Sequence, residues 1–174
     1  MSGKLTGFTL IELMVTIAVA AILLGIAVPN FVVFLQNNRL AAQTNELMGM
    51  LNFARSEAVK RAAVVRVCSR LNDTTCTGGQ NWDAGYLAFL DPDNNGQPDA
   101  ADDVLRIRGP MEGNNTLRAT RNDIVFQANG FSSGSNATFS ICDARGAASG
   151  RAVVINNQGR TRASTVALVG GGCP

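Results

Sequence analysis

The feature that most constrains the fold is a long apolar segment near the N-terminus, which runs with few breaks from Phe8 to Leu35. A segment of this length is sufficient for a membrane-spanning α-helix. One carboxylate, Glu12, lies close to its beginning. Because an ionised carboxylate in hydrocarbon costs several kcal/mol, a residue of this kind indicates a function and requires a partner.

The residues around this carboxylate resemble a processing site. Gly7-Phe8-Thr9-Leu10-Ile11-Glu12 is similar to the site found in type IV prepilins and type II secretion pseudopilins. The resemblance implies that a prepilin peptidase cleaves after Gly7, removes residues 1–7 as a leader and methylates the new N-terminal amine of Phe8. It also implies that Glu12 neutralises the α-amino group of the neighbouring subunit in an assembling filament, since the two charges satisfy each other in lipid.

A plain secretory signal peptide or a simple membrane anchor is the alternative interpretation. Ala18-Val19-Ala20 could serve as a signal-peptide cleavage site. The apolar run continues well past these residues, however, and Glu12 would interrupt the apolar core of a signal peptide. Both features favour the prepilin interpretation.

A helical pattern continues beyond the apolar segment. After Gln36, apolar residues recur at helical spacing: Leu40, Leu47, Leu51, Ala54 and Ala58. Polar residues assigned to other faces of this helix are Arg39, Gln43, Asn45, Arg55 and Lys60. We therefore predict one helix from Thr9 to about Arg61, with a transmembrane half at residues 8–35 and an amphipathic half at residues 36–62. Pro29 should bend it, because proline removes a backbone hydrogen bond.

Past Arg61 the periodicity becomes that of short strands bounded by Gly, Asn, Asp or Pro. The predicted strands are Ala63–Ser69, Tyr86–Leu90, Val104–Arg108, Thr116–Thr120, Ile124–Gln127, Thr138–Cys142, Ala152–Asn156 and Thr165–Val169. We therefore predict an α+β fold of the type IV pilin-like class. In this fold the long N-terminal helix packs on a mostly antiparallel β domain formed by residues 63–174.

A second resemblance narrows the class. Glu46-Leu47 and the run from Leu51 to Val59, which reads LNFARSEAV, resemble the helix end of the GspH/FimT family of minor pilins and pseudopilins. The β-rich remainder is similar to that family more loosely. The resemblance implies that the partners are other major and minor pilins, the prepilin peptidase and an inner-membrane assembly platform.

The same resemblance implies a location. Before assembly, the protein would span the inner membrane once and hold its globular domain in the periplasm. After assembly it would be part of an extracellular pilus filament. These motifs do not distinguish a pilus subunit from a pseudopilin of type II secretion.

Gly159-Arg160-Thr161-Arg162 is the motif that bears on this choice. It resembles the glycine-arginine-any-arginine motif of FimT-type minor pilins that bind DNA during natural transformation. Two arginines at positions i and i+2 of an extended segment point to one side and can both reach phosphates. Gly159 allows a tight turn, and Arg145 and Arg151 could widen the basic patch.

Phosphate contacts of this kind would bind double-stranded DNA without reading its sequence and with strong salt dependence. The motif contains no aromatic residue for base stacking. The alternatives are a solvated hairpin turn in a subunit that acts only in filament or tip assembly, and a GspH-type pseudopilin of type II secretion.

Four cysteines, Cys68, Cys76, Cys142 and Cys173, lie beyond the membrane segment, in the part that the resemblance places in an oxidising periplasm. Three pairings are possible. We favour Cys68–Cys76 with Cys142–Cys173, since the second bridge would pin the C-terminus to the sheet and close a loop that contains both motif arginines. The spacing does not fit a close-spaced zinc motif, and the chain has no histidine.

An acidic loop has the ligand order of an EF-hand-type calcium site. Oxygens at positions one, three, five, nine and twelve, with glycine at six, would come from Asp91, Asp93, Asn95, Asp99 and Asp102. The flanking segments resemble strands instead of helices, and the last ligand is a short aspartate. We therefore favour a polar hairpin tip, with weak calcium binding as the alternative and no other cofactor expected.

Charge is unevenly distributed, although the net charge is only +2. Residues 71–105 contain seven aspartates and no lysine or arginine, whereas residues 116–174 contain six arginines and two aspartates. The chain has no histidine, no nucleophile elbow and no glycine-rich phosphate loop. We therefore expect that it is not an enzyme.

Overall fold

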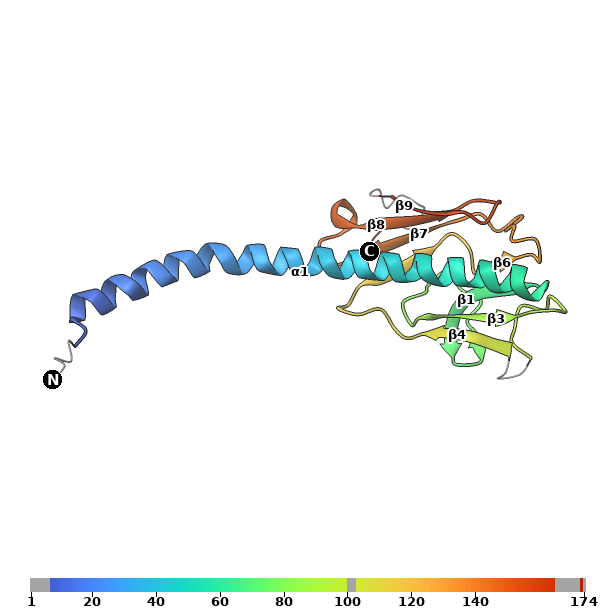
Figure 1. Cartoon of the computed structure of the whole chain (residues 1–174), viewed down its shortest axis with the longest axis horizontal. Helices are drawn as coiled ribbons and strands as arrows, with labels where there is room; N and C mark the ends of the chain where they lie inside the picture. Colours follow the sequence, from blue (N-terminus) through green and yellow to red (C-terminus); the bar gives the residue numbers. More distant parts are fainter. Residues whose placement is uncertain (1–6, 100–102, 165–172, 174) are drawn as a thin grey trace, which may run out of the picture. The chain divides into compact units, whose positions relative to one another are not determined.

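The computed structural model describes residues 7–99, 103–164 and 173 (Figure 1). It divides into two compact units, Met1–Asn37 and Asn38–Pro174. One helix, α1 (Leu10–Arg61), contributes residues to both units. The predicted helix from Thr9 to about Arg61 is therefore confirmed.

In the first unit, α1 is apolar and exposed along its length. It is the helix, among the residues described, that is long and apolar enough to cross a membrane. Pro29 lies inside α1 without ending it. The next residue, Asn30, donates a hydrogen bond from its side-chain amide to the carbonyl of Ile26, at 2.8 Å.

The second unit contains two antiparallel sheets. The first has the strand order β2-β1-β3-β4. In addition, β6 pairs with the first part of β1, from Val65 to Cys68. Its strands are β1 (Val65–Asn72), β2 (Thr75–Cys76), β3 (Tyr86–Leu90), β4 (Val104–Arg108) and β6 (Asp123–Phe126). The second sheet has the order β5-β7-β8-β9. Its strands are β5 (Thr116–Ala119), β7 (Ala137–Cys142), β8 (Arg151–Ile155) and β9 (Thr161–Ser164), with the short 3-10 helix η2 (Ala147–Ser149) between β7 and β8.

The second half of α1 lies along both sheets, with β1, β3 and β4 on one side and β7, β8 and β9 on the other (Figure 1). The five apolar helix residues predicted to form its buried face, Leu40, Leu47, Leu51, Ala54 and Ala58, are all fully buried. They share one core cluster with Val67 and Ile124 of the first sheet and with Phe139 and Val153 of the second. The α+β fold, with a long helix packed on antiparallel sheets, is confirmed.

One polar helix residue was assigned to the wrong face. Gln43 is buried, although its type predicted exposure. Its side-chain amide donates to the carbonyl of Glu112 at 3.1 Å and accepts from the Asn115 side chain at 2.6 Å. Because both of its polar atoms have partners, Gln43 can be buried at low cost.

Seven of the eight predicted strands coincide with observed strands, with boundaries that differ by a few residues. The eighth, Thr165–Val169, falls outside the described residues. Two strands were missed. β2 has only two residues, and β9 includes Arg162 and Thr161, which we had read only as part of an extended motif.

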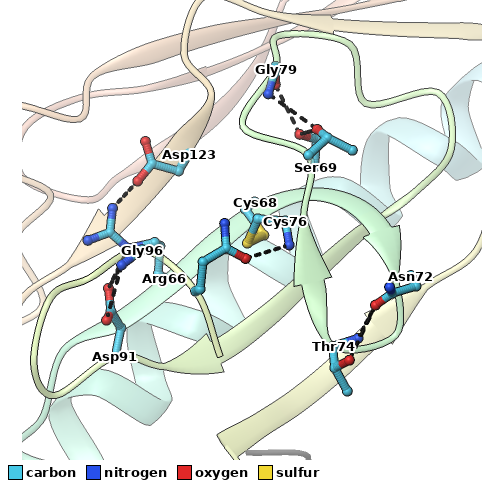
Figure 2. Close-up of a disulfide and its surroundings, with 12 residues drawn as sticks. Arg66, Cys68, Ser69, Asn72, Thr74, Cys76, Gly79, Asp91, Gly96 and Asp123 are labelled. Carbon is cyan, nitrogen blue, oxygen red and sulfur yellow. Dashed lines mark hydrogen bonds and ion pairs between the residues drawn. A yellow bond between two sulfur atoms is a disulfide. The ribbon is translucent and has the colours of Figure 1, made fainter. Parts of the chain in front are cut away.

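The structure forms the disulfides Cys68–Cys76 and Cys142–Cys173, the pairing that the sequence favoured. Cys68–Cys76 joins β1 to β2 within one hairpin (Figure 2). Cys142–Cys173 ties the end of β7 to a residue next to the C-terminus. In the second case the two Cα atoms are 5.4 Å apart.

Candidate nucleic-acid interface

The predicted arginine motif lies at the turn between β8 and β9, a unit that we call the arginine hairpin (residues 151–164). Asn156 organises the turn. Its carbonyl accepts a hydrogen bond from the Gly159 amide at 2.9 Å, and its side-chain oxygen accepts from the amides of Gln158 (3.1 Å) and Arg160 (3.0 Å). An asparagine at the start of a turn commonly acts in this way, so the local sequence itself specifies this geometry.

Gly159 is required at this turn for two reasons. Its φ is +72°, in the left-handed region that favours glycine. A Cβ added at this residue would also lie 2.5 Å from the carbonyl oxygen of Gly130. Any larger residue would therefore force the turn away from the loop beneath it.

The register of the hairpin determines which side chains share a face. Thr161 lies opposite the buried Ile155, on the core side of the sheet, and its hydroxyl donates to the side-chain oxygen of Asn52 on α1 at 3.0 Å. Arg162 lies opposite Val154, on the outer side. Since side chains alternate along extended backbone, Arg160 lies on that outer side as well.

Both arginines border one shallow pocket of about 370 Å³, which is also lined by Val154 and Asn156. Arg160 and Arg162 are exposed. Neither forms an ion pair with any residue that the structure describes. Two guanidinium groups thus face one side of the hairpin with their donors available to an external anion.

The other two arginines of the predicted patch lie elsewhere. Arg145 is in the turn between β7 and β8, where its guanidinium contacts the carboxylate of Asp143 at 2.6 Å. Arg151 lies opposite Ile141 in β7 and shares the core-side parity of Val153 and Ile155. The structure therefore brings together Arg160 and Arg162, and it places Arg145 and Arg151 away from them.

The acidic loop is organised around a buried arginine. Asp91 is fully buried, and Arg66 Nε contacts its carboxylate at 2.5 Å. The same guanidinium bonds to the carboxylate of Asp123 and, at 2.6 Å, to the side-chain oxygen of Asn94. Figure 2 shows Arg66 between Asp91 and Asp123, with the backbone amide of Gly96 also directed at the Asp91 carboxylate.

Arg66 neutralises the carboxylate that would have been the first ligand of a calcium site. Burial by itself lowers the pKa of the Arg66 guanidinium, but the hydrogen bonds to Asp91 and Asp123 outweigh that effect and raise the pKa. Sequence analysis missed this role. The signal was present, because Arg66 is a single charged residue between Val65 and Val67 in a predicted strand.

Other side chains of the loop are hydrogen-bonded to one another. The Asn95 side-chain amide donates to Asp93 at 2.8 Å and to Asp99 at 2.9 Å. Asp102 lies outside the described residues. Over the ranges 7–99 and 103–164, no group of three or more histidine, cysteine, aspartate or glutamate residues is placed to hold a metal ion. Calcium binding stays a prediction.

The processing residues lie at the start of the first unit. Gly7 and Phe8 precede α1 and are exposed, and Glu12 is in its first turn. The Glu12 amide donates to the hydroxyl of Thr9 at 3.3 Å. Thr9 therefore caps the N-terminus of the helix with its hydroxyl, a local role that the sequence did not reveal.

Two family descriptions match the chain. "Type II transport protein GspH" matches residues 43–159, which is more than half of the chain. "Prokaryotic N-terminal methylation motif" matches residues 6–28. The GspH match ends at Gly159, so Arg160 and Arg162 lie outside it. No curated protein matches the chain.

Among solved structures, the chain is similar to the type IV minor pilin FimU of Pseudomonas aeruginosa (strain PAO1) in two crystal forms. The P21 form has a TM-score of 0.62 and 24% identity, and the match covers 81% of this chain and 99% of the FimU chain in the crystal. The P65 form has a TM-score of 0.58 and 22% identity, with coverage of 77% and 99%. At this level of identity the likeness shows a shared fold.

The buried pair Arg66–Asp91 leads to a stability prediction. Replacement of Arg66 by leucine should lower the free energy of unfolding by about 3–5 kcal/mol, because Asp91 would remain buried without its positive partner. Urea denaturation followed by circular dichroism would measure the change. Arg121→Ala is the control, since Arg121 is exposed and the change should stay within about 0.5 kcal/mol. A similarly small effect for Arg66→Leu would show that Asp91 does not depend on Arg66.

The pair Asp143–Arg145 leads to a pH prediction. The hydrogen bond from Arg145 holds the pKa of the Asp143 carboxyl below its usual value, although partial burial opposes this. The pair therefore stabilises the fold fully above the unfolded pKa of about 3.9 and loses this contribution as pH falls through the lower folded pKa. Wild type should be more stable than Arg145→Ala at pH 7, and the difference in denaturation midpoint should shrink towards pH 2. A difference that is constant with pH would contradict this account.

Proposed function

We propose that this protein is a minor pilin of a type IV pilus and that it binds extracellular DNA. The chain belongs to the GspH family and carries a prokaryotic N-terminal methylation motif. That the chain is a type IV minor pilin or a GspH-like pseudopilin follows from the family and the fold. The DNA that it binds would be taken up during natural transformation.

One observation carries the DNA proposal: Arg160 and Arg162 are exposed on the same side of a constrained hairpin, without ion pairs in the described part of the chain. Of the other four arginines in the C-terminal block, Arg118 contacts Asp83 at 3.6 Å and Arg145 contacts Asp143. Arg121 lies in the turn between β5 and β6, and Arg151 lies on the core side of β8, so neither shares the hairpin face. An arginine without a carboxylate partner has its full set of donors available for a phosphate.

The chemistry of this surface favours backbone contact. Guanidinium groups bind phosphate oxygens through two donors each, and such contacts carry no sequence information. The pocket residues Val154, Asn156 and Thr161 include no aromatic side chain on which a base could stack. The ligand that fits is therefore double-stranded DNA of any sequence, bound through its phosphates.

Filament incorporation would use the other end of the chain. We propose cleavage between Gly7 and Phe8 by a prepilin peptidase, followed by methylation of the Phe8 amine, since residues 6–28 match the methylation motif. Glu12 would then pair with the corresponding amine of a neighbouring pilin within the membrane. The inner-membrane assembly platform and the other pilins of the filament are the partners that this step requires.

A second candidate function is favoured by a specific observation. The family match carries the description of a type II transport protein and ends before the two arginines. A GspH-type pseudopilin of type II secretion, or a minor pilin that acts only in pilus assembly or tip initiation, would need the helix and the core but not Arg160 and Arg162. In cells, loss of DNA uptake with secretion intact would favour the DNA-binding pilin over the pseudopilin.

Titration with DNA provides the direct test. The full chain in neutral detergent micelles would be titrated with non-specific duplex DNA at about 50 and 200 mM salt. Wild-type binding should weaken steeply with salt. For the Arg160→Ala/Arg162→Ala double variant, we expect affinity to fall by about tenfold or more at low salt, and the salt slope to fall by about 0.9 for each lost phosphate contact.

A matched control removes the same formal charge elsewhere. Arg39 of α1 and Arg106 of β4 are exposed and lie outside the second sheet, so Arg39→Ala/Arg106→Ala should keep its affinity within about twofold of wild type. If both double variants lose the same DNA affinity, the loss is an effect of net charge and not of the hairpin. Absence of binding by wild type would leave the assembly or secretion function.

Filament incorporation is tested separately through Glu12. Glu12→Ala should reduce the amount of this subunit in sheared filaments, because the neighbour's amine would lose its partner in lipid. The amount anchored in the membrane fraction should be unchanged, since the apolar helix is intact. Immunoblots of both fractions would measure this, and normal incorporation of Glu12→Ala would refute the proposed pairing.

A further inference from the structure

We propose that Arg55 of α1 is a positioning residue for the arginine hairpin, which it holds through the carbonyl of Gly130 without itself contacting DNA. The inference rests on the proposed function of Arg160 and Arg162. It gives a role to one residue of the LNFARSEAV run that sequence analysis had assigned only to a polar helix face.

Arg55 is connected to the arginine hairpin through the loop between β6 and β7. The Gly130 amide donates to the carbonyl of Gln127 at 2.7 Å, and the Gln127 amide donates to the carbonyl of Phe131 at 2.8 Å. This tight turn places Gly130 at φ +76°. Gly130 is buried, and Arg55 Nε donates to its carbonyl at 3.0 Å.

This loop also lies next to the turn of the hairpin. A Cβ added at Gly159 would lie 2.5 Å from the same Gly130 carbonyl oxygen and 3.3 Å from Arg55 Nε. The backbone of Gly159 therefore lies next to both groups, with no room for a side chain between them. Arg160 follows Gly159 in the chain, so the position of the Gly159 backbone determines where the Arg160 side chain is attached.

Two further bonds tie the hairpin to the same surroundings. The Ser132 amide donates to the carbonyl of Asn157 at 2.9 Å. The Thr161 hydroxyl donates to the side chain of Asn52, three residues before Arg55 on α1. The turn is thus held by bonds to α1 and to the β6–β7 loop, and Arg55 bonds to that loop directly beside the turn.

These contacts matter because β9 is an outer strand. In the described part of the chain, β9 pairs with β8 alone. A hairpin held at one side only would lose conformational freedom when it binds a ligand, and that loss weakens binding. Without Arg55, the buried Gly130 carbonyl would lack its donor and the loop under Gly159 would lose its tie to the helix.

Glutamine and methionine separate positioning from charge. The side-chain amide nitrogen of glutamine is the same number of bonds from Cα as arginine Nε, so Arg55→Gln keeps a donor at that place but removes the charge. Arg55→Met fills a similar length with neither donor nor charge. The two variants carry the same formal charge and differ in the donor to Gly130.

The experiment measures DNA affinity and its salt dependence for the full chain in neutral detergent micelles, using the same non-specific duplex. We expect Arg55→Gln to stay within about twofold of wild type with an unchanged salt slope, and Arg55→Met to bind about fivefold to tenfold more weakly. Hydrogen exchange of the Gly159 and Arg160 amides should be faster in Arg55→Met and unchanged in Arg55→Gln.

Several outcomes would overturn the inference. If Arg55 contacts phosphate directly, both variants should weaken equally and lower the salt slope by about 0.9. If Arg55→Met loses thermal stability but keeps its DNA affinity and amide protection, the residue acts only on the core. Should Arg55→Met fail to fold, Arg55→Lys replaces it, because lysine keeps the charge but has a methylene where Nε lies. Binding retained by Lys and lost by Gln would then refute positioning.

Failure of the positioning role of Arg55 can be distinguished from failure of the proposed DNA-binding function. If wild type does not bind duplex DNA, or if Arg160→Ala/Arg162→Ala binds as wild type does, the proposed function fails. If wild type binds and the double variant does not, while Arg55→Met binds as tightly as wild type, only the positioning role fails.

Discussion

The packing of one face of the second half of α1 against two antiparallel sheets is the interaction on which the rest of the structure depends. Its five fully buried apolar side chains, from Leu40 to Ala58, share one core with residues of both sheets. Because this face is buried, the position of the helix is fixed. Its other side chains can therefore hold the surrounding loops in place through hydrogen bonds. Gln43 binds Glu112 and Asn115, Arg55 binds Gly130, and Asn52 binds Thr161. The position of the helix therefore determines where the arginine hairpin lies.

Arginine has two distinct uses in this domain. Arg66 is buried, bonds to two carboxylates and joins the loop at Asp91 to the sheet, a structural role in which its charge is fully compensated. Arg160 and Arg162 are exposed and lack a carboxylate partner among the described residues. Arg55 is intermediate between the buried and the exposed arginines. It is partly buried, and it bonds to a backbone carbonyl instead of a carboxylate. Residue type alone does not separate these uses, because the separation depends on what lies within hydrogen-bond distance.

Much of the fold could be predicted because its signals are local. The apolar run and the helical spacing after Gln36 located α1, and short β-branched segments bounded by turn residues located most strands. The failures have physical causes. Gln43 was misplaced because a buried amide depends on partners about 70 residues away. β9 was missed because the strand Thr161–Ser164 has little apolar content and is held by pairing with β8. Arg145 and Arg151 were grouped with the motif by charge, but the turn and the strand parity place them elsewhere.

The sequence by itself determined the features that depend on neighbours along the chain: the apolar helix with Glu12, the processing motif, the Asn156–Arg160 turn with its obligatory glycine, and the arginine spacing that puts two guanidinium groups on one side. Only the tertiary structure decided which charges are compensated. Arg66 and Asp91 meet from β1 and from the loop that follows β3, and Gly159 meets Gly130 and Arg55 from three separate segments. The physical reason is that hydrogen bonds and ion pairs act over a few ångströms in space, whereas the residues that form them here are 25 to 109 positions apart in the chain.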